Sequence, residues 1–373
     1  MYTVYQHWDP LKVCVVGKSY PPDFYTWVDH VRTRSLLEKI AQETEEDYQK
    51  IIKCLESFDV KILRPRCANS VEQTIYNVVP PPPMTPRDQF VMIANTFYRT
   101  HDTPWEIFYR NVKDDTWPEY VNSIDDLDHV RQKECREMFG WQQDSLHHSY
   151  AYKNIIDHVA DQGNVIKRSP LDIVAGSMVT RLGRDLYFGT NTYHDNLEQL
   201  QRGVDLEFTQ TRNHIVNTGG HSDGTYCPVC PGLIISLRDV PTYAETFPGW
   251  EVIYLPQQSW HLVKTFVDLK AKNQGRWWIK DHPVDDHFID FVDTWMSNWV
   301  GYVEETVFDV NMLIIDPKNV IVFNENERVF KALDRYGMTA HVIPFRHRFF
   351  WDGGIHCVTL DLDRQGKMQN FFQ

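Results

Sequence analysis

The chain has 373 residues, of which 42% are hydrophobic and 13% aromatic, and its formal net charge is −13. This composition supplies a large buried core and argues against a disordered chain. The negative charge disfavours nucleic acid and anionic membranes as partners, whereas it would attract a small cationic substrate. Neither a leader-like start nor an uncharged apolar run of about 18 residues is present. We therefore expect a soluble, cytoplasmic protein.

The predicted elements alternate between strands and helices along the chain. A β-branched strand over Lys12–Gly17 precedes a helix over Arg34–Leu55, whose acidic stretch Glu43–Asp47 is expected to face solvent, and Val60–Leu63 is the next strand. Further strands are expected at 90–94, 185–189, 233–236, 252–255, 312–315, 320–323 and 341–343, and helices at 195–201 and 326–336. This alternation indicates an α/β fold. No segment marks a boundary, so we expect one domain over residues 1–373.

The seven cysteines are scattered and odd in number, which favours reduced thiols over a disulfide framework. Cys227 and Cys230 have the CxxC spacing of half a zinc site, but the sequence offers no second pair of ligands. A strand is the favoured interpretation of this segment, and no metal is expected.

Cys357 stands in the run Gly353–Thr359, directly before an apolar segment. The glycine pair lets the backbone turn sharply or approach a ligand closely, which makes Gly354 a candidate substrate-binding residue. A free cysteine in this position is either a small buried side chain or a nucleophile. The heptapeptide alone leaves both interpretations open.

A second polar group of residues is the glycine-flanked pair His221 and Asp223. A histidine can carry protons between a leaving amine and an incoming nucleophile, and its charged form favours a neighbouring thiolate. The segment could equally be an ordinary polar turn.

Three further carboxylates, Asp88, Asp172 and Asp185, are candidates for holding a guanidinium group, which presents five donors in one plane. Taken singly, each aspartate is more often a helix cap or a surface charge.

These motifs together resemble the arginine:glycine amidinotransferase family, which belongs to the pentein superfamily of guanidine-modifying enzymes. The similarity runs along most of the chain and is most specific in its last segment. The segments that carry it are Trp8–Leu11, Val15–Gly17, Pro86–Asp88, Gly183–Asp185, His221–Asp223 and Gly353–Gly366.

The resemblance implies a five-fold α/β propeller of ββαβ-like modules with the active site at its centre. It also implies that Cys357 attacks the guanidinium carbon of a donor such as arginine, and that His221 protonates the departing amine. Asp88 and Asp223 match the carboxylates that hold the guanidinium. An amine acceptor then removes the amidino group from sulfur, without a cofactor or a metal. A homodimer is a further expectation from the family.

The chain departs from the family pattern at three positions. The aspartate that orients the catalytic histidine is replaced by Met178, for which Asp172 is the candidate substitute. A serine before the last glycine-rich turn is replaced by Phe350, and the arginine that receives a substrate carboxylate by Val240, with Arg238 two residues away. The acceptor therefore need not be glycine.

An amidinotransferase is the leading hypothesis from the sequence. A hydrolase of the arginine deiminase or dihydrolase type would share the first half of the reaction and use water as the acceptor. A propeller that binds guanidino compounds without turnover is the third hypothesis, supported by Met178.

Overall fold

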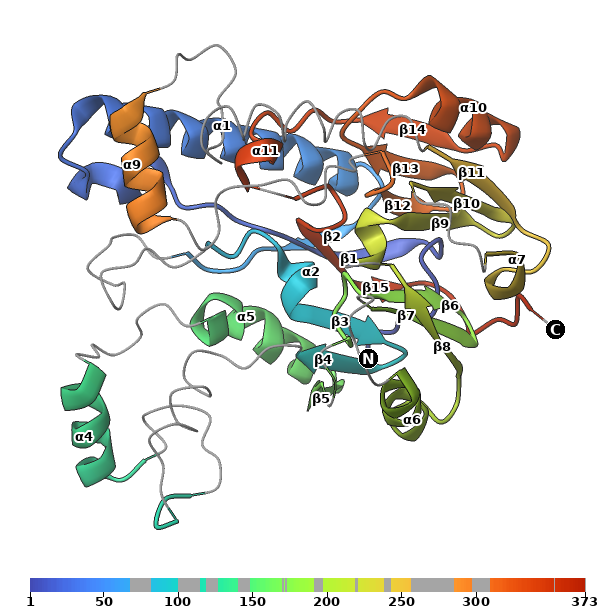
Figure 1. The fold of residues 1–373 in the computed structure, drawn as a ribbon, viewed down its shortest axis with the longest axis horizontal. Coiled ribbons are helices and arrows are strands. Elements are labelled where there is room, and N and C mark those ends of the chain that lie inside the picture. The colour runs from blue at the N-terminus through green and yellow to red at the C-terminus, as the bar shows by residue number, and fades with distance from the viewer. Residues whose placement is uncertain are drawn as a thin grey trace.

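The computed structural model describes residues 1–67, 82–99, 115–118, 127–139, 148–169, 171, 173–190, 197–218, 221–237, 243–255, 285–296, 309–351 and 353–372. Within these residues the strands form five sheets of three strands each (Figure 1). The predicted α/β class and its five modules are thus confirmed.

All five sheets follow one plan, in which an antiparallel pair is extended by a third, parallel strand. A parallel third strand requires a crossover connection, and helices lie in these connections. Four sheets are consecutive in the chain: β3 (Phe90–Ile93), β4 (Thr96–Arg99) and β5 (Val165–Arg168); β6 (Val179–Leu182), β7 (Asp185–Thr190) and β8 (Arg212–Asn217); β9 (Tyr226–Cys230), β10 (Leu233–Ser236) and β11 (Glu251–Tyr254); β12 (Leu313–Asp316), β13 (Asn319–Val322) and β14 (Thr339–Val342).

The fifth sheet joins the two ends of the chain. Its strands are β1 (Leu11–Val16), β2 (Lys61–Leu63) and β15 (Thr359–Arg364), in the order β15-β1-β2. Strand β15 runs antiparallel to β1, with Cys14 opposite Asp361 and Val16 opposite Thr359. Because β15 begins two residues after Cys357, this pairing sets the last candidate motif against the first strand.

The helices lie mainly on the outside of the sheets (Figure 1). The longer ones are α1 (Val31–Glu56), α4 (His129–Phe139), α5 (His148–Asp161), α6 (Leu197–Glu207), α9 (Asp286–Trp295) and α10 (Glu327–Arg335). The short ones are η1 (Pro22–Trp27), α2 (Pro86–Gln89), η4 (Ser222–Gly224), α7 (Tyr243–Thr246) and α11 (Arg348–Trp351). Three of the short helices, α2, η4 and α11, carry or directly precede the candidate site residues.

Helix α1 forms because apolar side chains recur at helical spacing and pack into a core cluster, among them Leu37, Ile40 and Tyr48. The predicted exposure of the acidic stretch on this helix is wrong for Asp47, which is fully buried. Asp47 accepts hydrogen bonds from Arg346 N (2.8 Å) and Arg346 Nε (3.0 Å). The helix face that carries Asp47 therefore packs against the segment before α11 instead of facing water.

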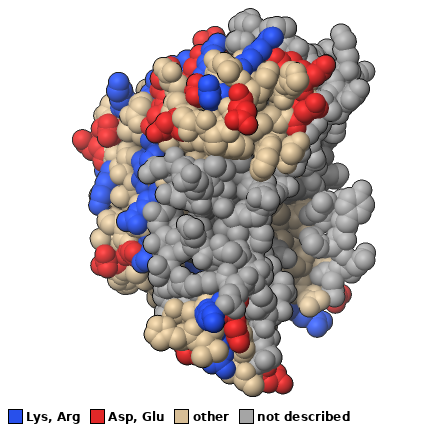
Figure 2. Space-filling view, turned by 90° about the vertical axis from the view of Figure 1, so that its left-hand side faces the viewer, with Lys and Arg blue, Asp and Glu red and all other residues tan. Residues whose placement is uncertain are grey.

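The described part of the face that carries α9 and the start of α1 shows acidic and basic side chains intermingled (Figure 2). An ion pair between Arg32 and Asp285 (2.8 Å) links α1 to the N-cap of α9. Among the helices that the structure describes, none has both the length and the apolar character needed to cross a bilayer.

Candidate active site around Cys357

Cys357 lies in a buried turn between α11 and β15, and its exposed fraction is 1%. The turn is closed by hydrogen bonds from Val358 N to Gly354 O (3.1 Å) and from Thr359 Oγ1 to Ile355 O (2.7 Å). The thiol nevertheless faces polar groups, since Sγ lies 3.6 Å from Asp223 Oδ2. Cys357 is therefore a buried thiol in a polar setting.

Asn311, which precedes β12, is the closest polar neighbour that the structure gives to this thiol. Its Nδ2 donates to Cys357 Sγ (3.1 Å) and to Asp223 O (3.3 Å). Its Oδ1 accepts from His356 N (2.8 Å) and Cys357 N (3.3 Å). The sequence analysis missed this residue. A signal for it exists, because Asn311 is the single polar side chain within the apolar run Val310–Ile315.

Asp223, in η4, lies between the thiol of Cys357 and the imidazole of His356. Its Oδ2 lies 2.7 Å from His356 Nδ1. Burial lowers the pKa of His356 well below its ordinary value, and the nearby Arg87 guanidinium lowers it further. The ring is therefore neutral at pH 7, and we assign its proton to Nδ1, where it meets the carboxylate. His356 was not among the predicted site residues, although it precedes the cysteine in the same motif.

His221 and Asp88 form the more open side of the site. His221 is the N-cap of η4, and Asp88 lies in α2. The distance from His221 Nδ1 to Asp88 Oδ1 is 3.8 Å, and the side chains are 36% and 25% exposed. Asp88 thus lies near His221, and Asp223 lies near Cys357. His221 and Asp223 are two residues apart in the chain, so the structure brings these four predicted residues close together.

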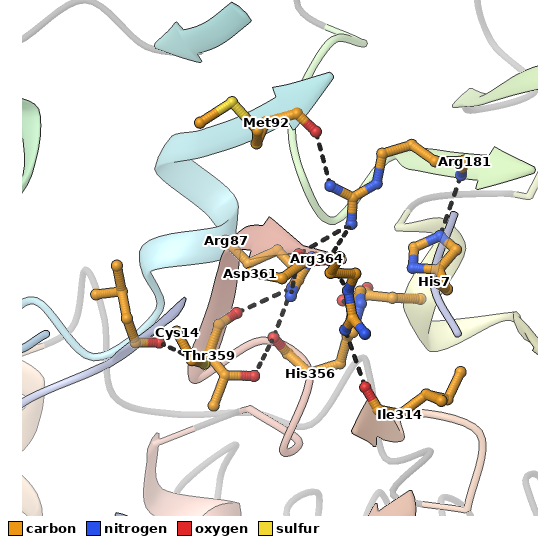
Figure 3. Close-up of polar contacts among 12 residues, drawn as sticks. His7, Cys14, Arg87, Met92, Arg181, Ile314, His356, Thr359, Asp361 and Arg364 are labelled. Atoms are coloured by element: carbon orange, nitrogen blue, oxygen red, sulfur yellow. Dashed lines mark hydrogen bonds and ion pairs between the residues drawn. The ribbon is translucent and has the colours of Figure 1, made fainter. Parts of the chain in front are cut away.

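A cluster of buried charges lies beneath the turn (Figure 3). Asp361 forms ion pairs with Arg87 (3.0 Å), Arg181 (2.8 Å) and Arg364 (2.6 Å), and all four side chains are nearly or fully buried. Burial alone would raise the pKa of the Asp361 carboxyl, but the three guanidinium groups hold it well below its ordinary value. Asp361 is therefore charged, and the cluster is locally cationic.

Arg87 connects this cluster to the Cys357 turn. Its Nε donates to His356 O (2.7 Å) and to Thr359 O (2.9 Å), which lie on either side of the cysteine (Figure 3). Arg87 is also the neighbour of Asp88 in α2. One buried side chain thereby fixes the position of a candidate guanidinium-binding carboxylate relative to the candidate nucleophile.

Comparisons with known proteins bear on this arrangement. No protein-family model matches the chain. An L-arginine:L-lysine amidinotransferase from Pseudomonas savastanoi pv. phaseolicola is 25% identical over 201 residues, which are 52% of this chain and 44% of that protein. The mitochondrial glycine amidinotransferase of Gallus gallus is 27% identical over 202 residues, which are 52% of this chain and 39% of that protein. The chain therefore matches less than half the length of these curated relatives.

Two solved structures match over the full length. One is an amidinotransferase of the saxitoxin biosynthetic pathway from Microseira wollei, with a TM-score of 0.61 and 18% identity. The other is the inosamine-phosphate amidinotransferase from Streptomyces griseus, with a TM-score of 0.60 and 18% identity. Each match covers 100% of this chain and 99% of the other. The chain is therefore similar in sequence to curated amidinotransferases over about half of its length, and similar in fold to two amidinotransferases over all of it. Its fold is the pentein fold that the sequence predicted.

Other candidate positions are placed less directly at the site. Gly354 packs against Asn311, because an added Cβ would lie 2.2 Å from Asn311 Oδ1. Its predicted contact with substrate stays a prediction.

Asp185 forms an ion pair with Arg212 (2.6 Å) and a hydrogen bond with His214 (2.9 Å). The predicted site residues Asp172 and Arg238 lie outside the described residues, as does Val240.

Met178, where the resemblance led us to expect a histidine-orienting aspartate, contacts the site through its backbone. Its carbonyl oxygen accepts from Ser222 Oγ (2.9 Å) and from Gly189 N (2.8 Å). The neighbouring Ser177 O accepts from Asp223 N (3.2 Å). This segment therefore holds η4 in place, while it supplies no carboxylate to the imidazole of His221.

All seven cysteines are free, as predicted. Cys227 and Cys230 lie in β9, as the interpretation of that segment as a strand required, and burial raises the pKa of Cys227 to about 12. Within the described residues there is no group of three or more histidine, cysteine or carboxylate side chains that could hold a metal.

A small cavity of about 20 Å³ lies on the inner side of the site, lined by His356, Asp223, Ser177 and Cys227 among others. It has room for about one water molecule. Because Cys357 does not line it and an arginine is far larger, this cavity is not the substrate pocket.

Proposed function

We propose that the chain transfers an amidino group from a guanidino donor such as arginine to an amine acceptor, through a covalent intermediate on Cys357. The observation that supports this best is the setting of the thiol, with Sγ 3.1 Å from Asn311 Nδ2 and 3.6 Å from Asp223 Oδ2. A thiol surrounded by a hydrogen-bond donor and a carboxylate suits attack on a planar cation.

The first half-reaction would form a bond between Cys357 Sγ and the central carbon of the guanidinium. The bond from that carbon to the amine of the donor then breaks, and His221 gives a proton to the departing nitrogen. The second half-reaction reverses these steps, because His221 removes a proton from the acceptor amine, which attacks the same carbon. The carbon–sulfur bond breaks and the thiolate is restored. Atoms and protons therefore balance over one cycle without a redox partner.

The carboxylates would orient the donor during both steps. A guanidinium needs acceptors in its plane. Asp88 lies 3.8 Å from His221, and Asp223 follows His221 by two residues in η4. Asp223 Oδ2 already faces His356 Nδ1, so its place beside the sulfur is fixed before the donor arrives. This preorganisation would align the carbon of the donor with Sγ.

Two further roles follow from the resemblance and remain proposals. Asp172 would support the imidazole of His221 in place of the residue that Met178 replaces. Arg238 would receive a carboxylate of donor or acceptor. The family members named above act on different acceptors by their names, which include lysine and glycine, so we assign no acceptor to this chain.

Intact-mass measurement after incubation with arginine tests the nucleophile. We expect an added amidino group on the wild-type protein and on Cys54→Ala, a matched control whose cysteine lies on α1, and none on Cys357→Ala. An adduct that persists on Cys357→Ala would contradict the proposal.

A second measurement identifies the acceptor class. Ornithine that appears only when an amine is added supports the transferase, and the amine should be recovered as its guanidino derivative. Citrulline formed without any amine would indicate the hydrolase instead. Neither adduct nor product with any guanidino donor would indicate a binding protein.

A further inference from the structure

We propose that Asn311 is a positioning residue that holds the sulfur of Cys357 and the backbone turn that carries it. This inference rests on the proposed function only in taking Cys357 as the reactive thiol.

The contacts of Asn311 use the whole hydrogen-bonding capacity of its amide. A primary amide has two N–H donors and two acceptor lone pairs. Here Nδ2 meets Cys357 Sγ and Asp223 O, while Oδ1 meets the backbone N–H groups of His356 and Cys357. The residue is 1% exposed. A side chain with all of its hydrogen bonds formed is held in one orientation, and its contact with Sγ in turn fixes the position of the thiol.

Gly354 shows how closely the turn is built around this amide. Any side chain at position 354 would collide with Asn311, since a Cβ there would lie 2.2 Å from Oδ1 and 2.4 Å from Cγ. The absence of a side chain at Gly354 thus lets the turn wrap around Asn311. The glycine of the motif and the asparagine, which lie far apart in sequence, form one structural unit.

The donor from Asn311 also bears on the reactivity of the sulfur. An N–H group directed at sulfur stabilises a thiolate more than a thiol, whereas the carboxylate of Asp223, 3.6 Å away, has the opposite effect. Asn311 therefore offsets the carboxylate that guanidinium binding requires. The same amide fixes the backbone of both partners, because it also contacts Asp223 O.

The replacement Asn311→Asp tests this directly, because aspartate has nearly the same shape and loses both N–H donors. The measurement is the rate of alkylation of Cys357 by iodoacetamide as a function of pH, followed by mass spectrometry of the peptide that contains it. Asn164→Asp is the matched control. Asn164 is also buried, and its Nδ2 likewise donates to two acceptors, Tyr2 O (2.8 Å) and Asn95 O (2.9 Å), neither of which belongs to the Cys357 turn.

We expect Asn311→Asp to slow alkylation of Cys357 at pH 7 by about tenfold or more and to move the pH midpoint upward. Asn164→Asp, which loses two donors elsewhere, should give the wild-type profile. A purely structural role would change the thermal stability of Asn311→Asp without moving the midpoint, so unchanged alkylation in a folded variant overturns the proposal. Because alkylation needs no donor, this result is independent of whether the chain transfers amidino groups.

If Asn311→Asp does not fold, Asn311→Ser is measured in the same way, with the same expected shift. If neither variant folds, the wild-type profile decides. Burial and Asp223 both disfavour a thiolate and the donor of Asn311 offsets them, so we expect Cys357 to titrate at or below the ordinary thiol value of about 8.5. A midpoint above that value overturns the proposal.

Discussion

The turn that carries Cys357 and the pair formed by His221 and Asp88 are held to different degrees. Cys357 is 1% exposed and its turn is hydrogen-bonded to Asn311, Arg87 and its own backbone. His221 and Asp88 are 36% and 25% exposed and stand 3.8 Å apart. In the proposed mechanism, the attacking sulfur would therefore be held in place before substrate binds, while the groups that contact the substrates would stay accessible.

The stability of the protein should depend more on the buried charges beneath the Cys357 turn than on the pair formed by His221 and Asp88. In Asp361→Asn the guanidinium groups of Arg87, Arg181 and Arg364 would lose the one carboxylate that they share. Breaking a buried ion pair in this way typically costs ~3–5 kcal/mol. We expect the free energy of unfolding, measured with urea, to fall by about that amount.

The control for this variant is Asp157→Asn, which breaks an exposed ion pair with Lys153 on α5. Its effect should stay below ~1 kcal/mol. An Asp361→Asn protein as stable as this control would mean that the cluster does not support the turn.

A substitution in the partly exposed pair of His221 and Asp88 should change activity more than stability. Asp88→Asn removes a partly exposed carboxylate that would balance the charge of the donor. We expect kcat/KM for the guanidino donor to fall about 10- to 100-fold, the usual loss for a hydrogen bond to a charged group, with unfolding changed by less than ~1 kcal/mol.

Steady-state kinetics and urea unfolding on the same preparation test this pair of effects. The exposed carboxylate of Glu327, paired with Lys331 on α10, provides the control variant Glu327→Gln, which should leave both quantities unchanged. If Asp88→Asn lowered the free energy of unfolding as much as Asp361→Asn but left kcat/KM unchanged, Asp88 would support the fold and not the reaction.

Much of the fold could be predicted from strands that are buried on both faces. Leu233–Ser236 was predicted to the residue, and Phe90–Ala94 and Val320–Phe323 to within one residue at each end, because their apolar runs have few other interpretations. The outer strands β5 (VIKR) and β8 (RNHIVN) are largely polar and partly exposed, so no pattern marked them. A single domain over residues 1–373 stays a prediction.

The residues of the candidate site were likewise predicted only in part. Cys357, His221, Asp223 and Asp88 were found because they sit in short motifs. Asn311 depends on a contact between residues 46 apart, which periodicity cannot reveal. The error at Asp47 has a related cause, since an acidic residue is expected in water unless its partner is known, and Arg346 lies 299 residues away.

The neutral imidazole of His356, next to Cys357, makes the free energy of unfolding depend on pH. Burial first, then Arg87, lower its pKa below the ordinary 6.5, so the unfolded chain binds a proton more readily than the folded one. Stability from this group is complete above pH 6.5 and is lost as the pH falls from 6.5 toward the folded pKa. We expect a contribution of up to ~1.4 kcal/mol per pH unit to the slope.

Urea unfolding of wild-type protein and His356→Gln between pH 7.5 and about 5 isolates that contribution, because glutamine does not titrate. The wild-type slope should exceed that of the variant by up to one proton; His7, whose pKa burial also lowers, is present in both proteins. Parallel slopes would mean that folding does not lower the pKa of His356, and a wild-type slope smaller than that of the variant would mean that His356 is protonated in the folded protein. Its Nδ1–H bond to Asp223 would then be an ion pair, and the carboxylate beside the sulfur would be neutralised before any guanidinium arrives.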